Sequence, residues 1–236
     1  MEPSLYAAFA LGLILGVKHA LDADHLIAVS TIVGEHKNLK WASLIGAFWG
    51  LGHTTTLFAV GLLVIGLRVT IPPRLALGLE FLVALMLVFL GASILWRSFR
   101  DERLHAHVHA HNPETHTHFH LHGTSEEDHS HPHPFRSMRK PFLVGMVHGL
   151  AGSAALMLLV LTTIPSPFAG LAYILIFGIG SVGGMLALSN MIAVPFILTA
   201  RRFTLMNQWI RILAGTASIG FGLFLGWAIG FQQGLF

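Results

Sequence analysis

Long apolar runs separated by short polar stretches dominate this chain. An α-helix crosses a bilayer with roughly 20 predominantly apolar residues, and each run is long enough to do so. The pattern predicts six spans, at residues 4–33, 41–66, 74–97, 141–164, 167–196 and 207–231. The first lacks a basic leading segment and a small-residue cleavage site, so we expect a retained helix and not a signal peptide. The predicted fold class is an all-α membrane protein with six transmembrane helices.

Composition supports a membrane protein and excludes several other classes. Of 236 residues, 54% are hydrophobic and only 11% are charged, against about 25% charged in ordinary soluble domains. The absence of Cys excludes thiolate metal ligands and dithiol redox chemistry. The net charge is +3, but no basic face with interleaved aromatic residues is present. We therefore expect a lipid bilayer, and not a nucleic acid, as the surroundings of the chain.

Two segments of the chain echo each other. Gly16–Leu21 reads G-V-K-H-A-L and Gly145–Leu150 reads G-M-V-H-G-L, so each places a His three residues after a Gly. Blocks of three spans have opposite orientations because three is odd, which is the inverted-repeat plan of many transporters. We divide the chain into a first three-helix block (1–97), a loop (98–140) and a second three-helix block (141–236), and expect a 3+3 inverted repeat.

The distribution of Lys and Arg predicts the orientation. Eleven lie in or beside the connections on one side of the expected membrane, and only Arg68 and Arg74 lie on the other. Because cytoplasmic loops carry the excess of Lys and Arg, we expect a multi-pass protein of the cell membrane. Loop 98–140 should be cytoplasmic and both termini should lie outside.

Loop 98–140 is rich in histidine. Residues 105–133 hold eleven of the 16 His, in runs that read H-A-H-V-H-A-H, H-T-H-F-H-L-H and H-S-H-P-H. Such a polar tract is typical of a disordered, metal-binding segment; a low-complexity linker that binds metal adventitiously is the alternative. A functional tract would buffer cytoplasmic ions, and this would suit an importer's exit and an exporter's entry equally.

The first span carries an unusual group of ionisable residues. The run K-H-A-L-D-A-D-H holds Lys18, His19, Asp22, Asp24 and His25, although such a group inside a lipid-embedded helix costs about 3 kcal/mol on insertion scales. An ion pair between Lys18 and Asp22, four residues apart, would account for only two of the five.

Imidazole and carboxylate groups together suit Ni²⁺, Co²⁺ or Zn²⁺. The second and fourth spans each contribute one more histidine within an apolar stretch. The predicted metal site comprises His19, Asp22, Asp24, His25, His53 and His148.

The same residues carry a family resemblance. His19, Asp24 and His25 form H-x₄-D-H, which resembles the signature of the nickel/cobalt transporter (NiCoT/NicO) family, and G-L-G-H-T-T at Gly50–Thr55 resembles its second motif. The resemblance implies a polytopic permease for nickel and cobalt in which the H-x₄-D-H residues are essential. The chain lacks the Phe-Asp-Thr motif of eight-helix members. With His148 and six spans, it is most similar to the shorter branch of urease-accessory nickel permeases.

Helix geometry restricts how these residues can share an ion. His19 and His25 are separated by about 9 Å of rise on a regular helix, and Asp24 points about 100° away from them. Metal–nitrogen bonds of about 2 Å cannot bridge that distance. Either the helix unwinds near Gly16–Asp24, or two sites act in relay, or Asp24 serves another helix.

We expect a permease for Ni²⁺, with Co²⁺ a second substrate, that works in uptake; export of Ni²⁺, Co²⁺ or Zn²⁺ is the alternative. An intramembrane metalloenzyme is the rival of another class, but the chain lacks H-E-x-x-H. No P-loop sequence is present, so we expect no ATP hydrolysis. We expect no cofactor besides the transported ion. Cytoplasmic metallochaperones are candidate partners.

The orientation can be tested with reporter fusions. A reporter that is active only outside the cytoplasm should be silent within loop 98–140 and active after Phe236, because of the charge bias. The reverse pattern of activity would overturn the predicted orientation.

Overall fold

The computed structural model describes residues 3–34, 38–67, 71–100, 105–111, 114–120, 138–151, 164, 166–202 and 204–236. The helices in these ranges are α1 (Pro3–His19), α2 (Ala23–Val33), α3 (Leu39–Leu67), α4 (Pro73–Arg100), α6 (Arg139–Leu150), α8 (Pro167–Arg202) and α9 (Thr204–Trp227), which continues as the π-helical turn η1 (Ala228–Gln232). Two strands, β1 (His105–His111) and β2 (Glu114–His120), lie between α4 and α6 in the sequence.

Four helices are long and apolar enough to cross a membrane, namely α3, α4, α8 and α9. They correspond to four of the predicted spans. The first predicted span is a pair of helices, α1 and α2, bent by 54°. The predicted fourth span, 141–164, begins in the 12-residue α6, but residues 152–163 lie outside the described part of the chain. Four spans, or five if the bent pair counts as one, are therefore found in the described residues.

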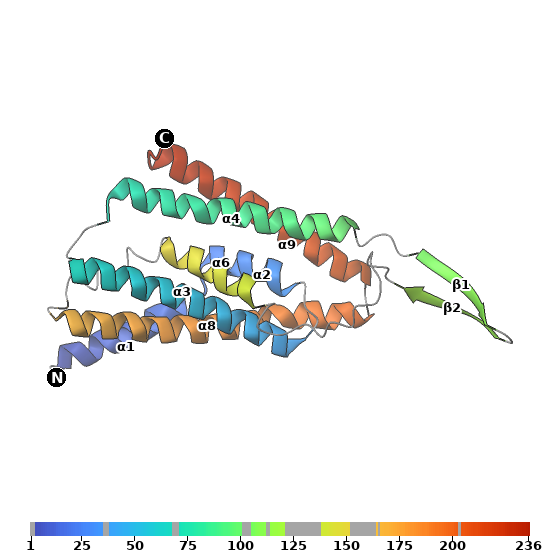
Figure 1. Cartoon of the computed structure of the whole chain (residues 1–236), viewed down its shortest axis with the longest axis horizontal. Helices are drawn as coiled ribbons and strands as arrows, with labels where there is room; N and C mark the ends of the chain where they lie inside the picture. The colour runs from blue at the N-terminus through green and yellow to red at the C-terminus, as the bar shows by residue number, and fades with distance from the viewer. Residues whose placement is uncertain are drawn as a thin grey trace.

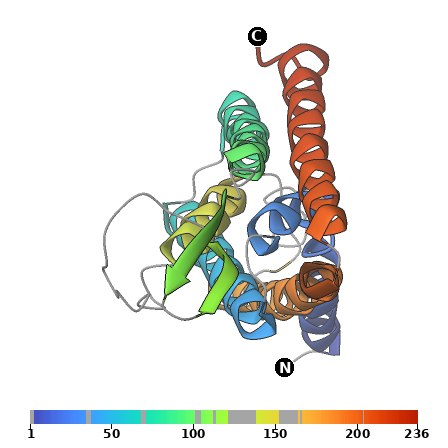
Figure 2. The same ribbon diagram turned by 90° about the vertical axis from the view of Figure 1, so that its right-hand side faces the viewer.

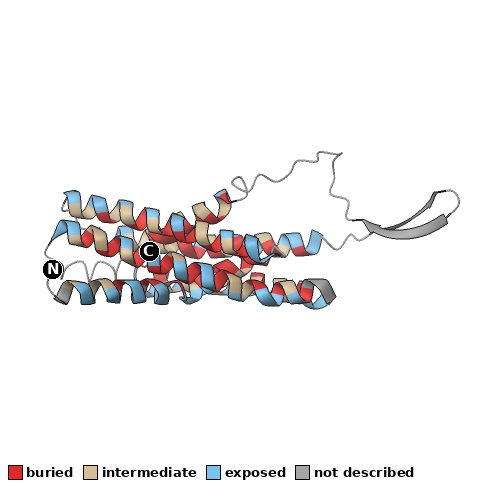
Figure 3. Ribbon diagram, turned by 90° about the horizontal axis from the view of Figure 1, so that it is seen from below, coloured by how far each residue is buried: buried red, intermediate tan, exposed pale blue. Residues whose placement is uncertain are grey.

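The helices form three layers (Figures 1 and 2). One layer holds α1, α3 and α8, the opposite layer pairs α4 with α9, and the short helices α2 and α6 lie between them. Figure 3 shows buried residues gathered between the helices and exposed residues along the outer faces. The outer faces carry large apolar side chains such as Phe89 and Trp96 of α4, which are 70% and 66% exposed. Lipid contact explains this exposure, since such faces would be unfavourable in water.

The first span is interrupted just after His19. The amides of Leu21 and Asp22 donate to the carbonyls of Lys18 and His19, at 3.0 Å each, which tightens the last turn of α1. Asp22 is extended (ψ 151°) and precedes α2, whose first turn contains Asp24. Asp is favoured at such N-terminal positions. The chain thus changes direction between two groups of candidate ligands.

Glycines allow close contact between α1 and α8, which run parallel. A Cβ on Gly16 would overlap the carbonyl oxygen of Phe177, and one on Gly180 would overlap that of Leu13. Helices in membranes approach this closely only at small residues. α1 is therefore fixed against the backbone of α8 up to the point where the first span breaks.

The contact between α6 and α3 is of the same kind, and these helices also run parallel. A Cβ on Gly145 would overlap the carbonyl oxygen of Trp49, and one on Gly52 would overlap that of Phe142. The helices α3 and α8 cross antiparallel. Gly46, in the first part of α3, lies near Met185 of α8, whereas residues later in α3 lie near earlier residues of α8. α3 and α8 thus form the centre to which α1 and α6 attach.

The His-rich loop is not wholly disordered, which corrects part of the sequence interpretation. β1 and β2 pair antiparallel, and the register sets His105, His107 and His109 opposite His120, His118 and His116. Alternation of residues with period two is the strand pattern, which explains why the H-x-H-x repeat can pair in this way. His111 lies opposite Glu114, and the remaining His of the tract, at positions 122, 129, 131 and 133, lie outside the described residues. The hairpin extends beyond one end of the helices, and both chain ends lie at the other (Figure 1).

The close helix contacts can be tested at two neighbouring glycines of α8. Gly180→Ala should destabilise the protein by about 1–3 kcal/mol, because the added Cβ meets backbone that cannot move aside easily. Gly183→Ala is the matched control, since nothing lies within 4 Å of its Cβ position. Thermal unfolding in detergent measures both. Equal melting temperatures for the two variants would contradict this account of the packing.

Candidate metal site

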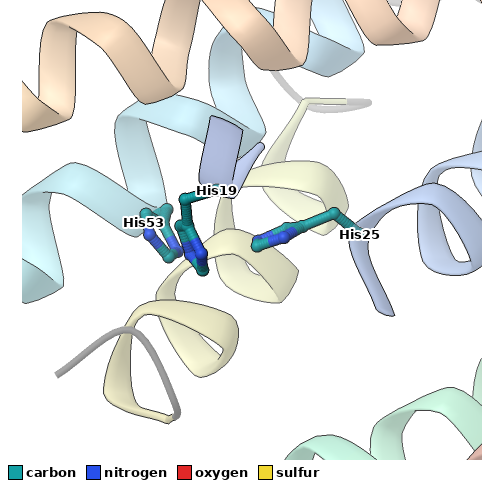
Figure 4. A group of neighbouring side chains, drawn as sticks. All are labelled: His19, His25 and His53. Carbon is teal, nitrogen blue, oxygen red and sulfur yellow. The ribbon is translucent and has the colours of Figure 1, made fainter. Parts of the chain in front are cut away.

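Three histidines converge where the first span is broken. His19 is the last residue of α1, His25 lies in the first turn of α2, and His53 lies in the middle of α3. Their side chains point toward one another (Figure 4). His25 and His53 are almost fully buried, and the His19 side chain is 11% exposed. The break therefore gathers imidazoles into the interior of the helical body.

The distances in this first group suit a shared ion. The ring centroid of His19 lies 4.6 Å from that of His25 and 5.1 Å from that of His53. One ligand atom from each residue lies within 4.8 Å of the others. On a regular helix the rise alone would separate His19 and His25 by about 9 Å. The sequence left open how His19 and His25 could approach one ion. In the structure, an interruption of the helix between them brings the two rings together.

A second group of possible ligands contains Asp24, His25 and His148, again with ligand atoms within 4.8 Å of one another. His148, from α6, donates through Nε2 to Asp24 Oδ2 at 2.7 Å, and its ring stacks on that of His25 with centroids 4.2 Å apart. Asp24 thus also forms a hydrogen bond with a residue of another helix, α6. His25 belongs to both groups, so the two candidate positions for an ion are adjacent.

Several buried nitrogens in these groups have no hydrogen-bond partner among the described residues. They are His19 Nε2, both ring nitrogens of His25 and of His53, and His148 Nδ1. A buried polar atom without a partner costs about 1–3 kcal/mol, and native structures contain few of them. A neutral imidazole has one nitrogen with a lone pair, and a metal ion would satisfy that nitrogen in each ring. The chemistry of the donors therefore fits a divalent cation of the Ni²⁺, Co²⁺ or Zn²⁺ type.

Asp22 lies outside both groups. Its carboxylate, which is 49% exposed, accepts a hydrogen bond of 2.7 Å from Nδ1 of His19. It therefore bonds His19 rather than forming the Lys18 ion pair considered above. A carboxylate that accepts from one ring nitrogen fixes the tautomer and leaves the other nitrogen free to bind metal. In this geometry Asp22 contacts the ring of His19 on the side away from Nε2 and belongs to neither group of candidate ligands.

Two aromatic residues that the sequence did not single out form the walls of the site. Trp49, fully buried, has its ring centroid 5.7 Å from that of His148, and Phe177 lies 5.7 Å from His19. Trp49 precedes His53 by one helical turn, so the sequence spacing could have indicated that Trp49 lies on the same face of the helix as His53. Phe177 lies in a helix without histidine, so the sequence offered no such signal for it.

The comparisons with known proteins agree with one another. The family described as "NicO: High-affinity nickel-transport protein" matches residues 5–230. The urease accessory protein UreH of Bacillus sp. (strain TB-90) is 39% identical over 236 residues, which is 100% of this chain and 97% of that relative. No solved structure matches the chain.

The role of Asp22 predicts a graded effect of substitution. Asp22→Ala should weaken the apparent Ni²⁺ affinity by about 10–100-fold, because His19 loses the partner that orients it. Asp22→Asn should lose less, since its amide oxygen can still accept from Nδ1. The half-saturating Ni²⁺ concentration for flux into proteoliposomes measures this. An Asp22→Ala protein with the affinity of the parent would show that the bond to His19 does not matter.

Proposed function

This chain belongs to the NicO family of high-affinity nickel-transport proteins, and we propose on that premise that it imports Ni²⁺ into the cytoplasm through the His/Asp cluster. Family membership makes it a multi-pass membrane transporter and not an enzyme. The observation that carries the proposal is the pair of adjacent three-ligand groups, with unsatisfied buried nitrogens, inside otherwise apolar helices. Their members, His19, Asp24, His25, His53 and His148, are the proposed ligands.

The donor set favours Ni²⁺, with Co²⁺ as a second substrate. Four imidazoles, which are ligands of intermediate softness, and one harder carboxylate suit late divalent metals, and the chain has no Cys to favour softer ions. Trp49 and Phe177, both buried, lie beside His148 and His19, and apolar surroundings of this kind strengthen the electrostatic attraction between a carboxylate and a cation. An ion that enters can pass between the two groups because His25 can hold it in either one.

We further propose that blocks 1–97 and 141–236 form an inverted repeat. The support comes from contacts that exchange between the halves. Gly16 of α1 contacts Phe177 of α8, and Gly145 of α6 contacts Trp49 of α3. The first helix of each block thus packs against the long second span of the other block. Both pairs are parallel while α3 and α8 are antiparallel, which makes α1 and α6 opposite in direction.

The third spans of the two blocks, α4 and α9, also make equivalent contacts with each other. A Cβ on Gly91 would lie 2.5 Å from the carbonyl oxygen of Gly215, and a Cβ on Gly222 would lie 2.8 Å from that of Ala84. Gly91 follows Ala84 by as many residues as Gly222 follows Gly215. Each half thus repeats the contacts of the other across a pseudo-two-fold axis, which is the plan on which many transporters build alternating access.

The His-rich loop has a supporting role in this scheme. The register of β1 and β2 places three histidines of one strand opposite three of the other. With the loop on the cytoplasmic side, it would collect ions leaving the site and offer them to a cytoplasmic metallochaperone. With no P-loop sequence in the chain, the membrane potential, an ion gradient or a partner protein supplies the driving force.

Accumulation of radiolabelled Ni²⁺ by cells tests the proposal. Cells with the protein should accumulate more Ni²⁺ than cells without it, and His19→Ala, Asp24→Ala or His25→Ala should abolish the difference with the protein still inserted. Glu80→Gln, in α4 and outside the cluster, is the control for loss of a membrane carboxylate. Reduced Ni²⁺ content in expressing cells would establish export instead. Intact flux in two of the three cluster variants would rule out this site.

A further inference from the structure

One buried hydroxyl near the cluster has no assigned role. Ser181, in the middle of α8, is fully buried, and its Oγ has no hydrogen-bond partner among the described residues. Two other buried hydroxyls, those of Thr31 and Thr56, donate to the backbone carbonyls of Ala28 and Gly52, whereas those of Ser98 and Ser189 also lack a partner among the described residues. Because a buried hydroxyl without a partner is costly, the position calls for a ligand that the protein itself does not supply.

Ser181 lies beside the end of α1, at the level of His19. A Cβ on Gly16 would come 2.9 Å from the backbone nitrogen of Ser181. One turn earlier in α8, Phe177 contacts the His19 ring, and one turn later a Cβ on Gly184 would lie 2.6 Å from the Ala20 side chain. Residues spaced in this way share one face of a helix. Ser181 is therefore on the face of α8 that meets the break in the first span.

The exchange of contacts between the halves relates Ser181 to His53. In α8, Gly180 packs on α1 and the next residue is Ser181; in α3, Gly52 packs on α6 and the next residue is His53. Both residues are buried at the level of a site histidine.

The two aromatic residues beside the site, Phe177 and Trp49, are related in the same way. Phe177 lies 5.7 Å from His19, and Trp49 lies 5.7 Å from His148, again between equivalent helices of opposite halves. Phe177 precedes Ser181 by four residues, as Trp49 precedes His53. Ser181 thus occupies, in the second half, the place that His53 occupies in the first.

We propose that Ser181 is a further residue of the ion path, which offers its hydroxyl oxygen to the cation on the side of the site opposite His53. The inference rests on the proposed transport of Ni²⁺. A neutral hydroxyl is a weaker ligand for Ni²⁺ than imidazole. An ion therefore binds firmly at the imidazole groups and loosely beside Ser181, and conduction requires such weak steps for the ion to leave.

The first test compares two serines of α8. Ser181→Ala raises the half-saturating Ni²⁺ concentration for flux about two- to tenfold, in keeping with the loss of one polar contact. Ser189→Ala is the matched control, because Ser189 is also fully buried with an unpartnered Oγ but lies two turns away. Unchanged flux in Ser181→Ala, with the parent protein active, overturns the role of Ser181. Absence of flux in the parent protein would instead overturn the proposed function.

The second test uses the absence of Cys from the chain, so that one introduced thiol is unique. Ser181→Cys in the full-length protein is treated with a small membrane-permeant thiol reagent, with and without Ni²⁺, and compared with Ser189→Cys. Ni²⁺ slows labelling at position 181 and leaves position 189 unaffected. A thiol at 181 that cannot be labelled, or whose labelling ignores Ni²⁺, shows that this residue does not face the ion path.

Discussion

The site depends on the interruption of the first span between His19 and Asp24. A continuous helix would keep the two histidines of H-x₄-D-H too far apart for one ion, whereas the 54° bend brings their rings to 4.6 Å. Irregular backbone at membrane depth is tolerated only where protein covers it or where it lines a cavity. Here α2 lies between the two outer layers of helices, so protein covers the break that brings the candidate ligands together.

Close glycine contacts hold the break in place. Gly16 and Gly180 bring the backbones of α1 and α8 into close contact just before His19. α6 is fixed on α3 in the same way just before His148. The two segments that deliver site histidines are therefore rigidly attached to the crossed helices α3 and α8. Precision of this kind matters because metal–ligand distances tolerate errors of only about 0.2 Å.

Much of this arrangement could be predicted from the sequence, because its signals are strong in lipid. The lengths of the apolar runs predicted four complete spans and the bent first one. The energetic cost of ionisable groups in lipid indicated the residues that converge at the candidate metal site. The role of Asp22 could not be predicted, since a carboxylate near a histidine serves equally well as ligand or as hydrogen-bond acceptor. Phe177 carried no chemical signal of its own. The hairpin was missed because composition indicated disorder, although the alternation of His with other residues also has the period of a strand.

In the proposed inverted repeat, the two halves would share a scaffold but not a set of ligands. The first half supplies His19, Asp24, His25 and His53, while in the sequence of the second half the positions five and six residues after His148 are Ser153 and Ala154. Duplicated geometry gives a transporter two related conformations of similar energy. Duplicated ligands would double the affinity-determining groups and would hold the ion too firmly to release it. In the proposed mechanism, the first half would supply three of the four imidazoles and the carboxylate, with only His148 coming from the second half, so that a pseudo-symmetric scaffold could move without a second full set of ligands to hold the ion.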